Sequence, residues 1–315
     1  MPLHLPHGPL MIDIAGVELT DLDRELLSHP LVGGLILFAR NYESPQQLSK
    51  LTTEVHALRS PSLLIAIDHE GGRVQRCQKG FTRLPPMRAL GELWEENPQQ
   101  ALETTQRIGY TLASELRQNG VDFSFTPVLD LDWGRSQVIG DRSFHHDPQV
   151  VIQLAKQLIE GLHRAGMKAC GKHFPGHGWV EADSHFAMPI DERSLDELEI
   201  DMQPYRQLPL NAVMPAHVIY PKVDSLPAGF SPVWIKKLRE EIGFDGVVFS
   251  DDLSMEAASV AGNIVDRVKA AWSAGCDMLL VCNSPDKVAD VLSGWYPEFD
   301  SLRAERIVRL VPEQP

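Results

Sequence analysis

Residues 167–185 read MKACGKHFPGHGWVEADSH, and this stretch decides how the fold is interpreted. It begins with a short apolar run, Met167–Gly171, which is typical of a strand buried on both faces of a parallel sheet. Lys172 and His173 come next, followed by a loop whose glycines and proline disfavour a helix. Enzymes with parallel sheets keep their chemistry where a buried strand gives way to such a loop. The stretch therefore predicts one strand end of an active site.

Seven more apolar runs of similar length are spaced along the chain. Together the eight predicted strands are Leu10–Ala15, Gly34–Ala39, Leu63–Asp68, Phe123–Asp130, Met167–Gly171, Ala212–Ala216, Gly246–Ser250 and Met278–Cys282. Stretches with helical patterning separate them, and several open with a proline and close at a glycine. These predicted helices are Pro45–Leu58, Pro98–Asn119, Pro148–Ala165, Leu195–Leu208, Pro232–Glu241, Ile264–Ala274 and Asp286–Leu292.

This alternation predicts an α/β fold, a (β/α)₈ TIM barrel. We expect one domain spanning residues 1–315, with a last helix at about 301–310 that closes the floor or the side of the barrel. A doubly wound open sheet is the alternative. It requires a glycine-rich phosphate turn after an early strand, whereas we place Gly33 and Gly34 before their strand.

The composition excludes several classes of function. The chain is 43% apolar and 23% charged, with a formal net charge of -14. An acidic chain lacks the basic footprint of a nucleic-acid-binding protein, and it gives no reason to expect binding to an anionic membrane. The N-terminus has no signal-peptide pattern, and no stretch approaches the roughly 20 apolar residues of a membrane helix. The four cysteines form no CxxC pair, so we expect reduced thiols and a cytoplasmic protein.

A TIM barrel builds its active site at the C-terminal ends of its strands. Each predicted strand ends in polar residues, which are Asp13, Arg40, Asn41, Asp68, His69, Glu70, Asp130, Asp132, Lys172, His173, His217, Asp251, Asp252 and Asn283. Any one of them could be a turn residue or a satisfied core residue. A complete ring of them is difficult to attribute to chance, since burying unpaired charges is costly.

Metal binding is the first chemistry to consider. Four residues of the opening stretch could hold zinc in principle, namely His173, His177, Asp183 and His185. Two histidines four residues apart can share a metal when they lie on a helix, but Pro175 and Gly176 stand between His173 and His177 and disfavour a helix there. The sequence also has no HExxH motif and no paired cysteines. We therefore expect no metal and no cofactor. The sequence also lacks the GxSxG motif of a serine nucleophile and a phosphate-binding P-loop.

Carboxylate chemistry fits the strand ends better. Asp251 ends an apolar run in VVFSDDLSM and could attack the anomeric carbon of a sugar. Asp183 and His185 could form a proton donor with its orienting carboxylate, although a surface turn explains their spacing equally well. Because successive residues of a strand face opposite sides of the sheet, Asp251 and Asp252 face opposite sides. The sequence does not show which of the two faces the barrel interior.

Other charged and aromatic residues could bind a sugar. Charged donors at a barrel rim suit hydroxyl, acetamido and carboxylate groups, and the candidates are Arg76, Arg142, Lys172 and His173. Trp133 and Trp179 could stack on sugar faces or could equally be packing residues.

Five motifs together resemble glycoside hydrolase family 3. They are IDHEGGRVQR (67–76), GDRSF (140–144), KHFPGHG (172–178), EADSH (181–185) and FSDDLSM (249–255). Their order and their spread over nearly the whole chain resemble the short, single-domain bacterial branch, the cytoplasmic β-N-acetylhexosaminidases of peptidoglycan recycling. The resemblance implies a TIM barrel and a retaining mechanism with Asp251 as nucleophile. It also implies His185 as acid/base, oriented by Asp183. It implies substrate binding by Asp68, Arg76, Arg142, Lys172 and His173.

The same resemblance implies the substrate. It is N-acetylglucosamine at the non-reducing end of muropeptides that contain 1,6-anhydro-N-acetylmuramic acid, with or without peptide. A phosphorylase using the same residues is the second enzymatic interpretation. A non-catalytic sugar-binding barrel and a metal-dependent hydrolase are further alternatives. A small carbohydrate is then the partner, with no nucleic acid and no membrane, and we expect a monomer.

Overall fold

Eight parallel strands form the centre of the computed structural model, which describes residues 3–4, 7–181 and 188–312. They are β2 (Leu10–Ile12), β3 (Val32–Leu37), β5 (Leu64–Ile67), β8 (Phe123–Ser124), β9 (Cys170–Phe174), β10 (Ala212–Pro215), β13 (Val247–Val248) and β14 (Leu279–Val281). Strands β14-β2-β3-β5-β8 and strands β13-β10-β9 form two parallel sheets. Parallel bridges from Val128 to Lys172 and from Phe249 to Met278 join the sheets at both edges. The ring is closed, and the predicted (β/α)₈ barrel is confirmed.

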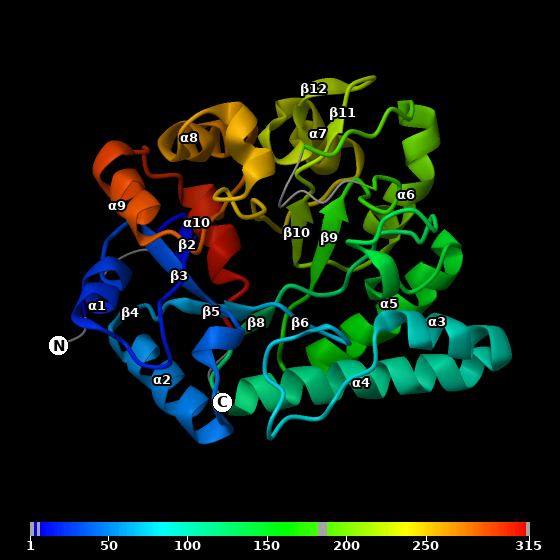
Figure 1. Cartoon of the computed structure of the whole chain (residues 1–315), viewed down its shortest axis with the longest axis horizontal. Coiled ribbons are helices and arrows are strands. Elements are labelled where there is room, and N and C mark those ends of the chain that lie inside the picture. Colours follow the sequence, from blue (N-terminus) through cyan, green and yellow to red (C-terminus); the bar gives the residue numbers. More distant parts are fainter. Residues whose placement is uncertain (1–2, 5–6, 182–187, 313–315) are drawn as a thin grey trace.

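Helices surround this ring (Figure 1). They are α1 (Asp21–Leu27), α2 (Pro45–Ala57), α3 (Met87–Glu96), α4 (Pro98–Gln118), α5 (Pro148–Arg164), α6 (Leu195–Gln207), α7 (Pro232–Lys236), α8 (Ile264–Ala274), α9 (Pro285–Gly294) and α10 (Ser301–Val308). Side-chain caps fix many of their starts. Ser44 accepts the Gln47 backbone N–H at the start of α2, and Ser194 and Glu197 form a capping box at the start of α6.

Shorter strands and helical turns lie outside the eight barrel strands and the main helices. The paired strands are β1 (Leu3–His4) with β4 (Arg59–Ser60), β6 (His69–Gly71) with β7 (Val74–Gln75), and β11 (Ile219–Tyr220) with β12 (Asp224–Pro227). The short helical turns are η1 (Ala39–Asn41), η2 (Gly140–Arg142), η3 (Ala228–Phe230), η4 (Lys237–Glu241) and η5 (Glu256–Ala261). The β6–β7 hairpin and η2 stand at the C-terminal end of the barrel and carry residues of the site described below.

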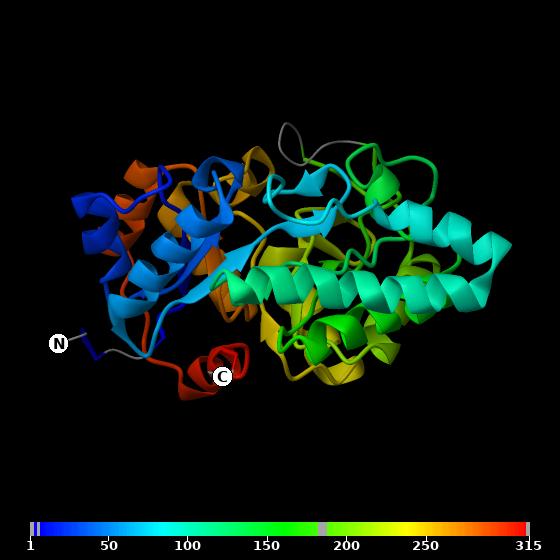
Figure 2. The same cartoon turned by 90° about the horizontal axis from the view of Figure 1, so that it is seen from below.

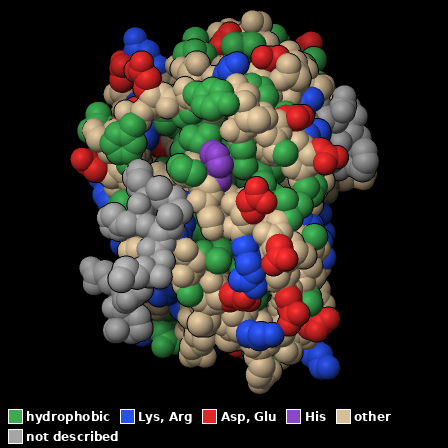
Figure 3. Space-filling model, turned by 90° about the vertical axis from the view of Figure 1, so that its left-hand side faces the viewer, with side chains coloured by type: hydrophobic (Ala, Val, Ile, Leu, Met, Phe, Trp, Pro, Cys, Tyr) green, Lys and Arg blue, Asp and Glu red, His purple; other side chains and the backbone are tan. Residues whose placement is uncertain are grey.

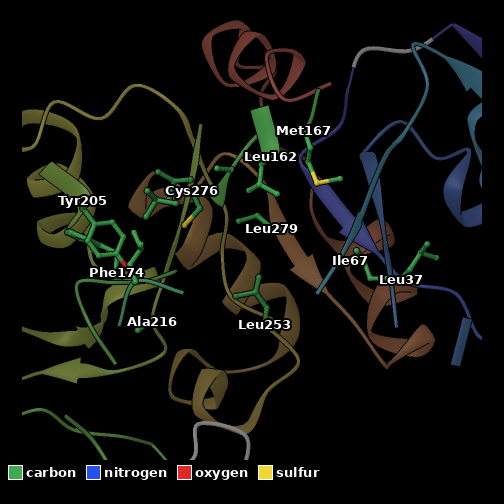
Figure 4. Packing of buried hydrophobic residues seen from close by; sticks show 14 of the residues in the cluster. Leu37, Ile67, Leu162, Met167, Phe174, Tyr205, Ala216, Leu253, Cys276 and Leu279 are labelled. Carbon is green, nitrogen blue, oxygen red and sulfur yellow. The ribbon is translucent and has the colours of Figure 1, made fainter. Parts of the chain in front are cut away.

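Alternation along the strands separates two apolar cores. The interior core consists of Met11, Ile36, Leu64, Ala66, Phe123, Phe125, Cys170, Ala212, Met214, Val247, Phe249, Met278, Leu280 and Cys282, together with Ile307 and Leu310. Intervening strand residues such as Ile65 and Val248 pack outward against the helices. Figure 4 shows part of this outer core, where Phe174 and Tyr205 meet edge to face with ring centroids 5.1 Å apart.

Helix α10 closes the floor of the barrel. Ile307 and Leu310 belong to the interior core, so this end of the chain fills the N-terminal mouth of the ring. Arg306 and Arg309 bond to Asp245, which precedes β13. Figure 2 shows α10, in red, on the opposite side of the molecule from the cyan β6–β7 hairpin. The predicted last helix is therefore present, and it takes the floor position.

Several predicted boundaries were wrong. Helices α1 and α3 were not predicted, and the helix predicted for 232–241 continues beyond α7 as the π-helical turn η4. The strand predicted for 123–130 stops at Ser124, since Pro127 cannot donate to a ladder. Strand β9 is shifted by three residues toward the C-terminus, so Lys172 and His173 lie inside it. Gly33 and Gly34 lie within β3, where a side chain on Gly33 would be 2.0 Å from the Gly8 carbonyl oxygen.

Surface charge is mixed on the face shown in Figure 3, where acidic and basic side chains are interspersed below a more hydrophobic region. Within the described part of the chain, no helix is long and apolar enough to cross a membrane. All four cysteines are buried and free of disulfides.

Candidate active site

A cavity of about 650 Å³ opens at the C-terminal ends of the strands. Its floor is the top of the interior core, including Ile36, Phe125, Met214 and Leu280. Its polar lining comprises Asp68, Glu70, Arg73, Arg76, Gln137, Arg142, Lys172, His173, His177, Glu181, Asp251, Asp252 and Asn283. Six of the eight predicted site residues therefore share one cavity. The other two, Asp183 and His185, lie outside the described residues.

Strand alternation explains how three of these residues enter the cavity. Ala66 faces the barrel interior, and Asp68 follows it by two residues. Cys170 and Lys172 have the same relation in β9. Val247 and Phe249 both face inward, which puts Asp251 on the interior side of its strand. The inward face of each strand thus changes from apolar to charged at its C-terminal end.

Five cavity residues form a chain of alternating charges. Arg76 lies 3.8 Å from Asp68, whose other oxygen is 2.7 Å from the Lys172 ammonium. Lys172 also lies 2.7 Å from Glu70, and both oxygens of Glu70 accept from the Arg142 guanidinium at 2.8 Å. Four of the five were predicted as substrate-binding residues. From the sequence, Glu70 was identified only as a polar residue at a strand end. Its position two residues after Asp68 was the signal that could have placed it in the site.

Charge pairing within this chain outweighs burial. Burial alone would raise the pKa of Glu70, but Arg142 and Lys172 hold it well below its ordinary value. Burial would lower the pKa of Lys172, but Asp68 and Glu70 raise it above its ordinary value. Both groups are therefore charged at neutral pH, and both residues line the cavity.

Asp130 organises the histidines of the opening stretch. Its buried carboxylate lies 2.7 Å from Nδ1 of His173 and accepts the backbone N–H groups of His173 and His177. Burial would raise the pKa of Asp130, but His173 and these hydrogen bonds lower it, so the carboxylate is ionised and can only accept. Nδ1 of His173 must then carry a proton, and Nε2 remains for a ligand. The sequence noted Asp130 without assigning it this role.

His177 lies beside this pair. It is buried and lines the cavity, and burial lowers the pKa of its imidazole, with His173 adding to the effect. Neither of its ring nitrogens has a hydrogen-bond partner within the described structure. Burial therefore favours a neutral imidazole at His177, and its place in the cavity lining was not predicted from the sequence.

Asp251 and Asp252 differ in their surroundings. The carboxylate of Asp252 accepts from the Ser254 backbone N–H and hydroxyl at 2.9 and 2.7 Å, and from the Cys282 backbone N–H at 3.2 Å. Burial raises the pKa of Asp252 to about 6. Asp251 accepts the Asp252 backbone N–H at 2.8 Å. Asp252 is thus bound into its own turn by three hydrogen bonds, whereas Asp251 follows the inward-facing Val247 and Phe249.

Other residues singled out in the sequence have structural partners. Trp133 and Trp179 pack edge to face with centroids 5.3 Å apart, and the Arg193 guanidinium lies over both rings. Neither tryptophan is among the described residues that line this cavity, and Trp179 lines a neighbouring pocket together with Arg135 and Glu181. Asp13 bonds to Arg40 and to the Asn283 backbone N–H, which ties the ends of β2, β3 and β14 together. No group of three or more potential metal ligands converges among the described residues.

Comparison with known proteins gives a consistent result. The family model described as "Glycosyl hydrolase family 3 N terminal domain" matches residues 10–307. A β-hexosaminidase from Methylobacillus flagellatus is 56% identical over 308 residues, covering 96% of this chain and 88% of the relative. The crystal structure of native NagZ from Neisseria gonorrhoeae superposes with a TM-score of 0.95 at 50% identity, covering 100% of this chain and 93% of that one.

A second structure of the Neisseria gonorrhoeae protein, in complex with N-trifluoroacetyl-D-glucosamine, also matches with a TM-score of 0.95 and covers 99% of this chain and 92% of that one. The family match spans nearly all of the chain, and the identity to the relatives reaches half or more. The chain therefore belongs to glycosyl hydrolase family 3, as one of its β-hexosaminidases.

Proposed function

We propose that the protein is an exo-acting, retaining β-N-acetylglucosaminidase that acts on muropeptides in the cytoplasm. The single observation that carries this proposal is the inward position of Asp251, in one cavity with the charged chain from Arg76 to Arg142. A carboxylate that faces a set of fixed donors can attack the anomeric carbon of a sugar held by those donors. We also propose that the chain forms a single catalytic domain, as expected from the sequence.

The proposed reaction has two steps. Asp251 forms a bond to the anomeric carbon while His185, oriented by Asp183, protonates the departing oxygen. Water then attacks the glycosyl-enzyme, His185 takes a proton from that water, and the Asp251–sugar bond breaks. The two displacements together retain the β configuration. The five family motifs support these roles for Asp183 and His185, both of which lie outside the described residues.

Several observations support the sugar and its aglycone. The Neisseria gonorrhoeae relative, at 50% identity, binds N-trifluoroacetyl-D-glucosamine, an N-acylated glucosamine. The buried end of the cavity carries Glu70, Lys172 and His173 and suits a fully enclosed sugar. Exposed lining residues such as Arg73 and Glu181 leave an open rim, which suits an exo-acting enzyme with a large aglycone. Four free, buried cysteines fit a reducing compartment.

The test compares Asp251→Ala with the parent on a chromogenic N-acetylglucosaminide and on a muropeptide. We expect a loss of at least about 10³-fold on both, the order seen when a catalytic nucleophile is removed. Asp290→Ala, which replaces an exposed carboxylate on α9, serves as control and should keep parental activity. Activity of Asp251→Ala within tenfold of the parent would exclude Asp251 as nucleophile. Formation of N-acetylglucosamine 1-phosphate when phosphate is added would instead indicate a phosphorylase.

A further inference from the structure

We propose that Glu70 is a positioning residue that holds the Lys172 ammonium and the Arg142 guanidinium side by side toward the bound sugar. The inference rests on the proposed function, because it concerns how the same cavity recognises its sugar. Glu70 itself need not touch the substrate. It acts by fixing two cations that do.

The geometry around Glu70 is fully formed. Its side chain is only 2% exposed, and its carboxylate contacts two cations from different parts of the chain. Oε2 accepts from Nε of Arg142 and Oε1 from Nη2, each at 2.8 Å, in the bidentate arrangement that fixes a guanidinium plane. Oε1 also lies 2.7 Å from Nζ of Lys172. One carboxylate therefore sets the direction of both cations.

The two cations need such a partner. Their side chains are buried, with 13% exposure for Arg142 and 3% for Lys172, so water screens their mutual repulsion poorly. Arg142 lowers the pKa of Lys172, whereas Asp68 and Glu70 raise it. Without the charge of Glu70, Lys172 would keep only Asp68 as a counter-ion among the described residues, while still facing Arg142. Lys172 should then lose its proton at a lower pH and turn away from Arg142.

The position of Glu70 in the fold supports this assignment. It lies in β6, and the β6–β7 hairpin spans residues 69–75 between two other members of the charged chain, Asp68 and Arg76. Arg142 closes the turn η2, which stands over the same cavity. Glu70 thus links three elements, because its carboxylate in the β6–β7 hairpin binds Arg142 of η2 and Lys172 of β9.

Glu70→Gln is the appropriate perturbation because it keeps the size of the side chain and removes its charge. One carboxylate oxygen becomes an amide NH₂ group, which places donor against donor at Arg142 in either orientation of the amide, and also at Lys172 when the group replaces Oε1. Glu70→Asp keeps the charge on a shorter side chain. Asp277→Asn is a matched control, because Asp277 is a fully buried carboxylate that bridges Arg239 at 2.5 Å and Arg306 at 3.1 Å, outside the cavity.

The experiment measures two quantities from about pH 6 to about pH 10 in the intact protein. They are the affinity for N-acetylglucosamine by calorimetry and the kcat and KM on a chromogenic N-acetylglucosaminide. For Glu70→Gln we expect Kd and KM to rise on the order of 10²-fold, the scale of one lost charge-assisted hydrogen bond, with a smaller change in kcat. The alkaline limb of kcat/KM should move to lower pH. Asp277→Asn should lower the melting temperature and leave both the affinity and the limb unchanged.

The outcomes separate this inference from the proposed function. If Glu70→Gln keeps its affinity within threefold of the parent and its alkaline limb in place, the inference is overturned. It is also overturned if Glu70→Asp, which retains the charge, shows the same shift of the limb as Glu70→Gln. A parent that binds N-acetylglucosamine without hydrolysing the substrate overturns the proposed function alone, and the affinities of the variants still test Glu70. A parent that neither binds nor hydrolyses overturns both.

Discussion

Replacing Asp130 with asparagine should move the proton between the ring nitrogens of His173, a proposed substrate-binding residue, without removing any side chain from the cavity. In the native protein the ionised carboxylate of Asp130 accepts from Nδ1 of His173 at 2.7 Å, which leaves Nε2 free to accept a hydrogen bond when the ring is neutral. In Asp130→Asn, the amide oxygen can still accept the His177 backbone N–H, now 2.7 Å from the carboxylate, and the amide NH₂ group then points toward His173. Nδ1 becomes the acceptor, and the proton moves to Nε2.

The expected magnitude follows from the bonds that change. The charge-assisted hydrogen bond between Asp130 and His173 is lost, and such a bond contributes about 1.5–3 kcal/mol. If that energy positions His173 for the sugar, kcat/KM should fall roughly 10- to 150-fold, since about 1.36 kcal/mol corresponds to a factor of ten. The free energy of unfolding should fall as well, because Asp130 is buried among donors that an amide satisfies less well.

Steady-state kinetics on a chromogenic N-acetylglucosaminide give the first measurement, and ¹⁵N NMR of the imidazole rings identifies the tautomer of His173. Asp122→Asn is a matched control. Asp122 is also a buried carboxylate, and it pairs with His56 at 2.8 Å and accepts the Ile65 backbone N–H at 3.0 Å, away from the cavity. This control variant should lose stability and keep its activity. An Asp130→Asn protein that keeps kcat/KM within threefold of the parent, or an unchanged tautomer, would refute the reasoning.

Three further predictions concern the acid/base, the barrel floor and the response to acid. His185→Ala should lose about 10²–10⁴-fold in rate on substrates with poor leaving groups and much less on an activated aryl glycoside, and equal losses on both would exclude its role as general acid. Leu310→Ala should lower the free energy of unfolding in urea by about 2–5 kcal/mol while the catalytic rate per folded molecule stays constant, because Leu310 fills the floor of the barrel and is 1% exposed. The folded-state pKa values of Glu70 and Asp130 are depressed, so their stabilising contribution is complete above about pH 5 and declines as the pH falls below about 4. Acid unfolding followed by tryptophan fluorescence should therefore be less steep in a Glu70→Gln/Asp130→Asn double variant than in the parent, and identical slopes would contradict that assignment.

The barrel could be predicted from the sequence because the number and order of its strands follow from the apolar runs along the chain. All eight predicted runs overlap a strand, since a strand buried on both faces leaves a near-continuous apolar signal. Boundaries were less accessible. β9 extends through Lys172 and His173 because the barrel supplies partners for polar residues that look like loop residues in the sequence. Helix α1 is short and acidic, and its capping box at Thr20 and Asp23 gave the only local signal.

The sequence predicted most residues of the site, but it did not predict the ion pairs and hydrogen bonds between them. Residue types at strand ends indicated Asp68, Lys172 and Asp251, but parity alone did not show which face of a strand lies inside the ring. The inward positions of Val247 and Phe249 supply that information for Asp251. The ion pairs that join Glu70 to Arg142 and Asp130 to His173 link residues 72 and 43 positions apart, and no local pattern encodes such a contact.

Trapping of the glycosyl-enzyme tests the central proposal most directly. The protein is incubated with a fluorinated N-acetylglucosaminyl donor that forms the covalent intermediate quickly and releases it slowly, and the intact mass and the labelled peptide are then determined. We predict a mass increase of one sugar residue, located on Asp251. A label on Asp252 or on any other residue would contradict this proposal, as would turnover with inversion of configuration and no covalent species.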